Sequence, residues 1–403
     1  MNIGIVTTWF ERGASYVSKQ YMEVLQQRYN VFIYARAGES YAKNNPKWDF
    51  DNVYWSKRID SPFTVTVIDK KEFISWIKKN KIETIIFNEQ HWWPPLIWCK
   101  ELGIKTIAYI DYYTEETVSL FEIYDFLICN TKKHLSAFKW HKGAIYIPWG
   151  TEIELFKPLT RNRSQNEKLV FFHSCGMNPL RKGTDLLLKA LANIKSNKFK
   201  LIIHTQTDLI NFFPELEKQI SKFEKEGILE VINKTVNAPG LYYLGDVYVY
   251  PTRLEGIGLT MVEAIASGLP IIVPDCGPMN EFVQEGVSQT VSVEKLFSRY
   301  DGYYWPQNEV DIMNLAKVMN TFINRIDDID DLKNISRLYA VENFDWSKNS
   351  IKIFEIIESK VVSDIISKNQ IISKIYTFER KGLRKYNNSF LKFKGIIKLF
   401  YKK

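Results

Sequence analysis

The feature that most constrains this chain is an alternation of short apolar runs with amphipathic helical patterns. In the first 150 residues the apolar runs lie at 2–8, 29–35, 83–89, 105–111, 125–131 and 143–149. Helical patterns lie between them at 18–28, 69–80 and 94–103. Strands that alternate with helices in this way form parallel sheets covered on both faces. The first part of the chain is therefore predicted to be an α/β domain with a doubly wound sheet.

A second alternation follows a polar segment without periodicity, PLTRNRSQNEK at 158–168. Its apolar runs lie at 168–176, 199–206, 246–252 and 269–275, with a helical pattern at 184–194. A chain of 403 residues has room for two domains. We therefore expect two Rossmann-like domains that face each other across a cleft. The expected boundaries are 1–158, a linker at 159–168, a second domain at 169–345 and a closing helix at 346–359.

Positive charge is concentrated at the C-terminal end of the chain. Residues 360–403 hold 12 Lys and Arg against 2 Asp and Glu, a net +10, so the preceding residues sum to −2 within the total of +8. On a helix, the apolar face of this tail would consist of Phe390, Phe393, Ile397 and Phe400, and the opposite face of Lys394, Lys398 and Lys402. Such a helix is typical of binding to an anionic membrane surface, here through 380–403. Packing on the protein itself or in an oligomer is the alternative, and the tail contains no recognised module for nucleic acid.

Composition argues against several other classes of protein. Hydrophobic residues make up 45% and aromatic residues 14%, which excludes an intrinsically disordered chain. The four cysteines form no CxxC pair and predict neither a disulfide framework nor a zinc site. The first residues, MNIGIVTTWF, lack the basic start of a signal peptide, and no apolar run reaches the roughly 18 residues that span a bilayer. We expect a cytoplasmic protein that is at most peripheral on the inner face of the membrane.

The stretch RLEGIGLTMVEAIASGLP, at 253–270, places two glutamates around a pair of glycines. The spacing of its apolar residues predicts a helix that ends at the segment SGLP. A glycine loop before a helix N-terminus offers free backbone N–H groups and therefore an anion site. Glu255 would lie at the loop and Glu263 more than two turns further along, which suits a ligand with a central phosphate and hydroxyls at both ends. A surface helix with two solvated acids is the alternative.

The segment 253–277 resembles the core signature of glycosyltransferase family 4, in which seven residues separate two glutamates. The segments IPWGTEIELFKP at 147–158 and SCGMNPLRKGTDLLLKAL at 174–191 are similar to further parts of that family, in the same order. The resemblance extends from Met1 to about Glu358. It implies a GT-B fold and the retaining transfer of a sugar from a nucleotide-diphosphate sugar to a hydroxyl of a glycan or lipid-linked glycan. It further implies cell-surface polysaccharide biosynthesis and no requirement for a metal or other cofactor.

This resemblance assigns roles to residues that match the signature. Glu263 is expected to bind the ribose hydroxyls of the nucleotide, and Glu255 to lie beside the reacting carbon of the donor sugar. The basic pair Arg181 and Lys182 is expected to hold the diphosphate and stabilise the leaving group. Backbone N–H groups of the glycine loop are expected to contact the donor, and that loop consists of Gly256, Ile257, Gly258 and Leu259.

The first domain is expected to hold the acceptor. Gly13 resembles the tight loop that brings the backbone near the donor phosphate and the acceptor. Glu11 and Arg12 beside it are candidate acceptor contacts. In the segment NEQHWWPP, Trp92 and Trp93 suit either a sugar face or core packing.

The chain departs from the family pattern at two positions. Met177 stands where many relatives carry an arginine, so one cation is either missing or supplied by Arg181, with Arg253 as another candidate. Asp111 stands where many relatives carry a histidine that faces the donor sugar. Aspartate accepts a hydroxyl or a proton but does not donate as a cation. Asp111 therefore joins the basic pair and the first glutamate as a candidate catalytic residue.

Two other functions stay open. A nucleotide-sugar epimerase with the same fold would release free sugar without an acceptor, and a non-catalytic binding subunit would anchor a partner at the membrane. The acidic clusters at 49–51 and 327–331 follow no convincing strand and are interpreted as solvated loops rather than metal sites. The nucleotide base, the sugar, the linkage and the acceptor depend on pocket shape, which one sequence does not reveal.

Overall fold

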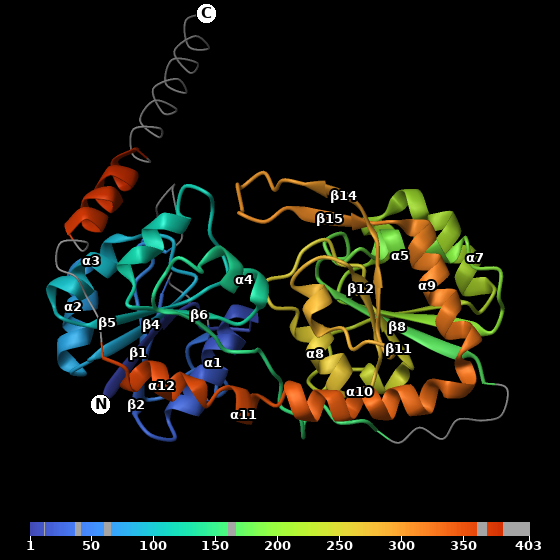
Figure 1. Cartoon of the computed structure of the whole chain (residues 1–403), viewed down its shortest axis with the longest axis horizontal. Helices are drawn as coiled ribbons and strands as arrows, with labels where there is room; N and C mark the ends of the chain where they lie inside the picture. Colours follow the sequence, from blue (N-terminus) through green and yellow to red (C-terminus); the bar gives the residue numbers. More distant parts are fainter. Residues whose placement is uncertain (12, 37–41, 60–65, 160–166, 361–368, 382–403) are drawn as a thin grey trace, which may run out of the picture. The chain divides into compact units, whose positions relative to one another are not determined.

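The computed structural model describes residues 1–11, 13–36, 42–59, 66–159, 167–360 and 369–381. These residues divide into two compact units (Figure 1). The first unit comprises 1–129, 137–145 and the described residues after 350. The second unit comprises 130–136 and 146–350. Most of the segment expected to be a linker, 160–166, lies outside the described residues.

A sheet with the strand order β3-β2-β1-β4-β5-β6-β7 forms the centre of the first unit. Its strands are β1 (Asn2–Thr7), β2 (Asn30–Ala35), β3 (Val53–Trp55), β4 (Thr84–Asn88), β5 (Lys105–Tyr109), β6 (Phe126–Cys129) and β7 (Ala144–Tyr146). The pairings from β3 to β6 are all parallel. The expected parallel sheet is confirmed, and only the short edge strand β3 has no counterpart among the predicted strands.

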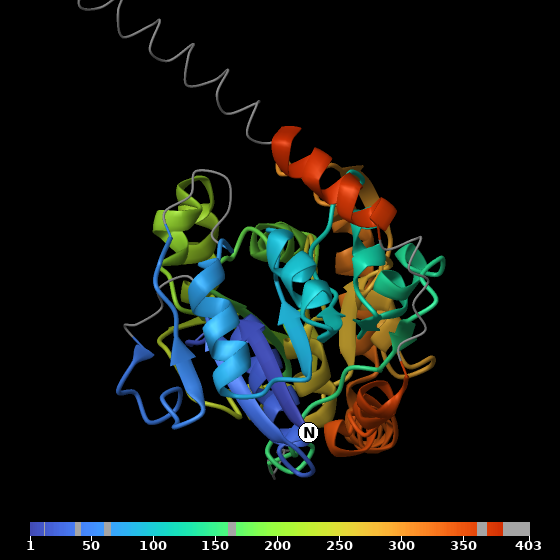
Figure 2. The same cartoon turned by 90° about the vertical axis from the view of Figure 1, so that its left-hand side faces the viewer.

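Amphipathic helices cover this sheet. They are α1 (Gly13–Leu25), α2 (Lys70–Lys79), α3 (Pro94–Glu101) and α12 (Lys352–Glu358). The side chain of Asp69 caps α2 by accepting a hydrogen bond from the backbone N–H of Glu72. Helices α2 and α3 lie side by side (Figure 2), where the ring centroids of Phe73 and Trp98 are 6.3 Å apart. Burial of such rings supplies much of the packing in this unit.

The second unit has its own parallel sheet, in the order β10-β9-β8-β11-β12-β13. Its strands are β8 (Leu169–Gly176), β9 (Phe199–Thr205), β10 (Leu229–Asn233), β11 (Val247–Val249), β12 (Ile271–Pro274) and β13 (Gln289–Val291). An antiparallel hairpin, β14 (Val293–Phe297) and β15 (Gln307–Val310), extends from this unit (Figure 1). The sequence analysis predicted the central strands but not the edge strands or the hairpin.

The helices of the second unit bury their apolar faces against its sheet. The longer ones are α5 (Thr184–Leu191), α7 (Glu217–Lys225), α8 (Leu259–Ala266), α9 (Ile312–Asn324) and α10 (Ile329–Asn343). Two short helices are α6 (Leu209–Phe212) and α11 (Trp346–Asn349). Phe171, Leu187 and Met319 are fully buried in a continuous core that joins β8, α5 and α9.

The interpretation of the acidic cluster 327–331 as a loop was wrong. Asp327 and Asp328 lie in a 3₁₀ turn, and Asp330 and Asp331 lie in the first turn of α10. Negative side chains at a helix N-terminus are stabilised by the helix dipole. The acids therefore favour the start of a helix. The sequence analysis missed this helix because aspartates are also typical of turns.

The described part of the basic tail packs on the first unit. Residues 369–381 are helical, and Ile371 and Ile375 are buried there. The Glu379 carboxylate accepts a hydrogen bond of 3.1 Å from the backbone N–H of Trp93. Apart from the exposed Arg380 and Lys381, the segment predicted to bind a membrane lies outside the described residues. None of the described helices is both long and apolar enough to cross a bilayer.

The topology of the second sheet identifies where a ligand would bind. Strand β8 lies between β9 and β11. The chain first continues from β8 to β9 and β10 on one side, and then returns to add β11 on the other side. The loops that follow β8 and β11 therefore leave the same edge of the sheet at a switch point. Open α/β sheets bind ligands at such a point.

Candidate functional site

Two loops meet at this switch point because a glycine allows close packing. Gly183 precedes α5 with φ +71°, and a Cβ atom there would lie 2.0 Å from the carbonyl oxygen of Pro251. The backbone N–H of Arg253 donates to the carbonyl oxygen of Arg181 at 2.8 Å. The hydroxyl oxygen of Thr252 lies 3.1 Å from the same oxygen. The loop after β8 is thus held against the loop after β11.

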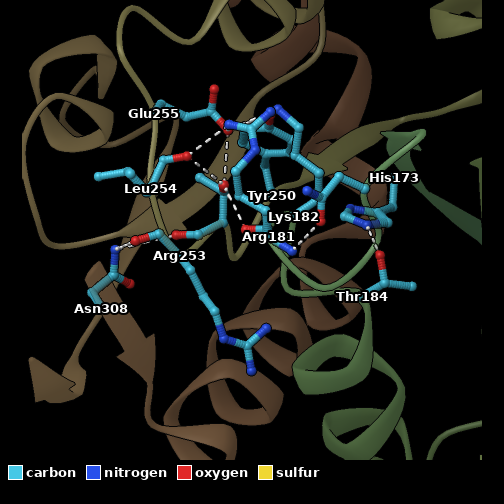
Figure 3. A network of polar contacts seen from close by, with 11 residues as sticks. His173, Arg181, Lys182, Thr184, Tyr250, Arg253, Leu254, Glu255 and Asn308 are labelled. Atoms are coloured by element: carbon cyan, nitrogen blue, oxygen red, sulfur yellow. Dashed lines mark hydrogen bonds and ion pairs between the residues drawn. The ribbon is translucent and has the colours of Figure 1, made fainter. Parts of the chain in front are cut away.

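The carboxylate of Glu255 is the centre of the resulting network (Figure 3). Its Oε1 atom accepts hydrogen bonds from Arg181 at 3.0 Å and from Lys182 at 2.7 Å. The same oxygen accepts from the hydroxyls of Thr252 and Tyr250, each at 2.8 Å. The residue is only 7% exposed. Burial alone raises the pKa of Glu255, but the two ion pairs outweigh it and lower the pKa to about 2.

The two cations respond in opposite ways to this environment. The charge of Glu255 raises the pKa of Arg181, whereas burial lowers the pKa of Lys182 and Glu255 only partly offsets that change. Lys182 also donates to the Tyr250 hydroxyl. Glu255, Arg181 and Lys182 together carry a net positive charge. Such a site stabilises an anionic leaving group, whose negative charge grows as its bond to the substrate breaks.

The second glutamate lies on α8. Gly258 has φ +87° and precedes the first helical residue, Leu259. The prediction of more than two helical turns between the glutamates was wrong, because Glu255 to Gly258 form a loop and Glu263 is in the second turn of α8. Burial raises the pKa of Glu263, and a hydrogen bond from Tyr242 opposes that change.

The side chain of Glu263 has one oxygen engaged. The Tyr242 hydroxyl donates to Oε2 at 2.6 Å. Within the part of the chain that the structure describes, Oε1 accepts no hydrogen bond. A half-buried carboxylate with one available oxygen suits a sugar hydroxyl pair.

A stack of tyrosines supports both glutamates, and the sequence analysis missed it. The rings of Tyr248 and Tyr250 stack with centroids 5.3 Å apart. Tyr242 contacts Tyr248 edge-on at 5.8 Å. Tyr242 therefore donates to Glu263 and Tyr250 to Glu255 from one packed layer. The alternating tyrosines of the segment YYLGDVYVY were the only signal in the sequence.

Removal of single tyrosine hydroxyls should separate the two roles. We expect Tyr250→Phe to lower kcat about tenfold and Tyr242→Phe to raise the Kd for the nucleotide about tenfold, since each loses a hydrogen bond to a charged group. Tyr248→Phe is the matched control, because its buried hydroxyl donates to neither glutamate among the described residues. Steady-state kinetics and melting temperatures test this. Equal effects of all three variants would show that the stack serves only packing.

Arg253 is not a cation available to a ligand. Its guanidinium pairs with both oxygens of Asp185, at 2.7 and 2.9 Å, and with Glu309 at 2.9 Å. It is 6% exposed. The alternative that Arg253 replaces the cation missing at Met177 was therefore wrong, since Arg253 joins α5 to β15. Met177 itself is 75% exposed.

The glycine loop also contacts α4 (Lys132–Ala137), whose residues 132–136 belong to the second unit. A ring nitrogen of His134 lies 3.2 Å from the carbonyl oxygen of Gly256. Burial and then Lys133 lower the pKa of His134 to about 3, so its ring is neutral and donates to this carbonyl. Ile257 is buried, and a Cβ atom at Gly256 would meet nothing within 4 Å.

The remaining predicted residues lie in the first unit. Gly13 begins α1, and a Cβ atom there would meet nothing within 4 Å. Asp111 follows β5, and burial, then Glu89, raise its pKa well above the usual value. Glu11 accepts a hydrogen bond from the hydroxyl of Tyr16, while Arg12 lies outside the described residues. Trp93 is 2% exposed and packs on Phe121, which agrees with a core role.

Comparison with known proteins gives a family match over the part of the chain that holds this site. Residues 167–298 match the model of the family described as Glycosyl transferases group 1. A lipopolysaccharide core biosynthesis mannosyltransferase of Rhizobium meliloti is 31% identical over 114 residues, 27% of this chain and 32% of that protein. An uncharacterized protein in the cps region of Klebsiella pneumoniae is 27% identical over 36% of this chain and 38% of its own length. The matches thus span about a third of these relatives.

Solved structures show the fold over most of the chain. The crystal structure of Anabaena HepE in complex with UDP has a TM-score of 0.70 and 16% identity, covering 89% of this chain and 100% of that one. WaaG, a glycosyltransferase involved in lipopolysaccharide biosynthesis, has a TM-score of 0.62 and 14% identity, covering 89% and 100%. The chain therefore has the GT-B fold of two parallel-sheet α/β domains, and the family match at 167–298 lies within the second unit.

Proposed function

We propose that this chain, with its glycosyl transferases group 1 domain, is a retaining glycosyltransferase that uses a nucleotide-diphosphate sugar. The observation that carries the proposal is the network in which Glu255 is held by Arg181 and Lys182 beside a glycine loop that begins a helix. The loop supplies backbone N–H groups and the basic pair supplies charge for a diphosphate. Glu263 supplies the carboxylate for the ribose.

The chemistry follows from these positions. The donor diphosphate leaves from the reacting carbon while Arg181 and Lys182 stabilise its growing negative charge. Glu255 stays ionised throughout, because its pKa is about 2, and it faces positive charge that develops on the sugar. The acceptor oxygen bonds to the reacting carbon on the face from which the diphosphate leaves, and the departing phosphate takes the proton of the acceptor hydroxyl. The scheme invokes no metal, and Arg181 and Lys182 offset part of the charge of the diphosphate.

The acceptor is proposed to be a glycan or a lipid-linked glycan of the cell surface. Support comes from the Rhizobium meliloti relative, which acts in lipopolysaccharide core biosynthesis, and from the similarity to WaaG. We further propose that the protein works in the cytoplasm at the inner face of the membrane, with Asp111 and Gly13 near the substrates. The net +10 of residues 360–403 would favour an anionic surface.

A thermal-shift screen tests the nucleotide assignment. We expect one of UDP, GDP, ADP, CMP and TDP to raise the melting temperature of the wild type by mass action, and Glu263→Ala to abolish that shift. HepE was crystallised with UDP, which makes UDP the first candidate. Glu230→Ala is the control, because Glu230 is an exposed carboxylate on the edge strand β10.

The screen also separates the proposal from its rivals. No shift with any nucleotide at millimolar concentration would contradict the proposal and favour a binding subunit. A nucleotide-dependent shift accompanied by release of free sugar without an acceptor would favour an epimerase. Transfer of labelled sugar to a membrane extract, lost in Glu263→Ala, would support the glycosyltransferase.

A further inference from the structure

Lys133 lies beside the glycine loop and is held by two other segments of the second unit. Its ammonium donates to the carbonyl oxygen of Gly277, after β12, at 2.7 Å. The ammonium also lies 5.2 Å from the ring centroid of Trp305, in the connection between β14 and β15. Its neighbour His134 contacts the carbonyl oxygen of Gly256. The side chain therefore lies where the three segments converge next to the donor loop.

The helix that carries Lys133 is firmly placed. The carboxylate of Glu281 accepts from the backbone N–H of Lys132 at 2.6 Å and from that of Lys133 at 2.8 Å. These hydrogen bonds engage Glu281 with the backbone and leave the ammonium of Lys133 to the carbonyl and the ring. Glu281 thus fixes the backbone of Lys133, and Gly277 and Trp305 fix the position of its ammonium.

Lys133 differs from the other cations of the site in its lack of a counter-ion. Arg181 and Lys182 pair with Glu255, and Arg253 pairs with Asp185 and Glu309. Among the described residues, no carboxylate lies within 4.0 Å of the Lys133 ammonium. Burial lowers the pKa of Lys133 to about 8, with opposition from Cys276, Glu281 and Glu255 at longer range. A half-buried ammonium without a counter-ion is costly, and an anionic ligand would reduce that cost.

We propose that Lys133, held by Gly277 and Trp305, binds an anionic oxygen of the donor substrate. The inference rests on the proposed function and names a third cation for it. The Glu255 network contributes a net charge of only +1 from two cations and one carboxylate, whereas a diphosphate carries more than one negative charge. The anionic oxygen belongs either to the diphosphate or to a carboxylate on the sugar, and both make the same charge-assisted hydrogen bond.

Calorimetric titration of three variants tests the proposal. Lys133→Met removes the charge, Lys133→Arg keeps it, and Lys132→Met removes an exposed charge from the adjacent position of the same helix. Each protein is titrated with UDP, UMP, UDP-glucose and UDP-glucuronate, or with the guanosine series if the nucleotide screen selects GDP. We expect Lys133→Met to weaken binding about tenfold or more, and Lys133→Arg and Lys132→Met to stay within about threefold of the wild type.

The ligands distinguish the two sources of the anion. If Lys133 binds the diphosphate, Lys133→Met weakens UDP binding but not UMP binding. If it binds a sugar carboxylate, UDP and UDP-glucose are unaffected and only UDP-glucuronate is weakened. Equal affinities of wild type and Lys133→Met for all four ligands overturn the inference alone. A parallel loss for UMP with a lower melting temperature also overturns it, because that shows a structural role. No nucleotide binding to the wild type overturns the proposed function and this inference together.

Discussion

Replacement of Glu255 by glutamine is expected to lower kcat by about 100-fold or more while nucleoside diphosphates bind as tightly as before or more tightly. The loss in kcat is expected because the substitution removes a preorganised negative charge that we propose to lie beside the reacting carbon. The gain in binding follows from the ion pairs, since Arg181 and Lys182 both donate to Glu255 and would turn to the diphosphate without it. Steady-state kinetics and calorimetric titration of the same preparation measure both effects.

A control and a pH series make this prediction sharper. Glu230→Gln removes a carboxylate that pairs with Lys200 away from the network and should leave kcat unchanged. The pKa of Glu255 is lowered from 4.5 to about 2, so its carboxylate stabilises the fold fully above pH 4.5. That contribution is lost as the pH falls from 4.5 towards 2. The difference in unfolding free energy between wild type and Glu255→Gln should therefore shrink only in this range. Weaker diphosphate binding by Glu255→Gln would contradict the assignment of the two cations.

Gly183→Ala is expected to destabilise the protein by about 3 kcal/mol or more and to abolish transfer. Alanine is strained at φ +71°, and its Cβ atom would lie 2.0 Å from the carbonyl oxygen of Pro251. The backbone of the two loops must then move apart. The loop after β8 carries Arg181 and Lys182, and the loop after β11 carries Glu255. Chemical denaturation measures the free energy of unfolding, and the transfer assay measures the loss of function.

Gly176→Ala is the matched control for this substitution. Gly176 has φ +53° at the end of β8, just before the loop that leads to α5, but a Cβ atom there would meet nothing within 4 Å. We expect a cost of about 1 kcal/mol, from backbone strain alone. If Gly183→Ala and Gly176→Ala destabilise the protein equally, close packing of the two loops does not organise the site.

Much of the fold could be predicted because its signals are local. Apolar runs with turn residues at both ends predicted β1, β4, β5, β8 and β12, and helical spacing predicted α2 and α5. The edge strands were harder to predict. Strand β10 has only Leu229 fully buried, so its hydrophobic pattern is weak. In the hairpin, β14 is largely exposed, and β15 is half-buried but has only one apolar residue, Val310.

The candidate site was likewise predicted only in part. The residues Glu255, Glu263, Arg181 and Lys182 were found because they stand in short segments that resemble a family signature. The tyrosines that position the glutamates were not found, because Tyr242 and Glu263 are brought together only by packing of η4, a 3₁₀ turn at Tyr242–Leu244, against α8. Their assignment to roles in transfer stays a prediction that the substitutions above test.

The sequence by itself determined the two parallel sheets, the glycine loop and the identity of the charged residues around it, because periodicity, turn chemistry and short motifs are properties of neighbouring positions. Only the tertiary structure decided which cations are available to a ligand. Arg253 is only two residues away from Glu255, yet its guanidinium pairs with Asp185 and Glu309. Lys133 is far away in the chain, yet it lies beside the glycine loop without a carboxylate partner among the described residues. Ion pairing depends on distance in space, which separation along the chain does not specify.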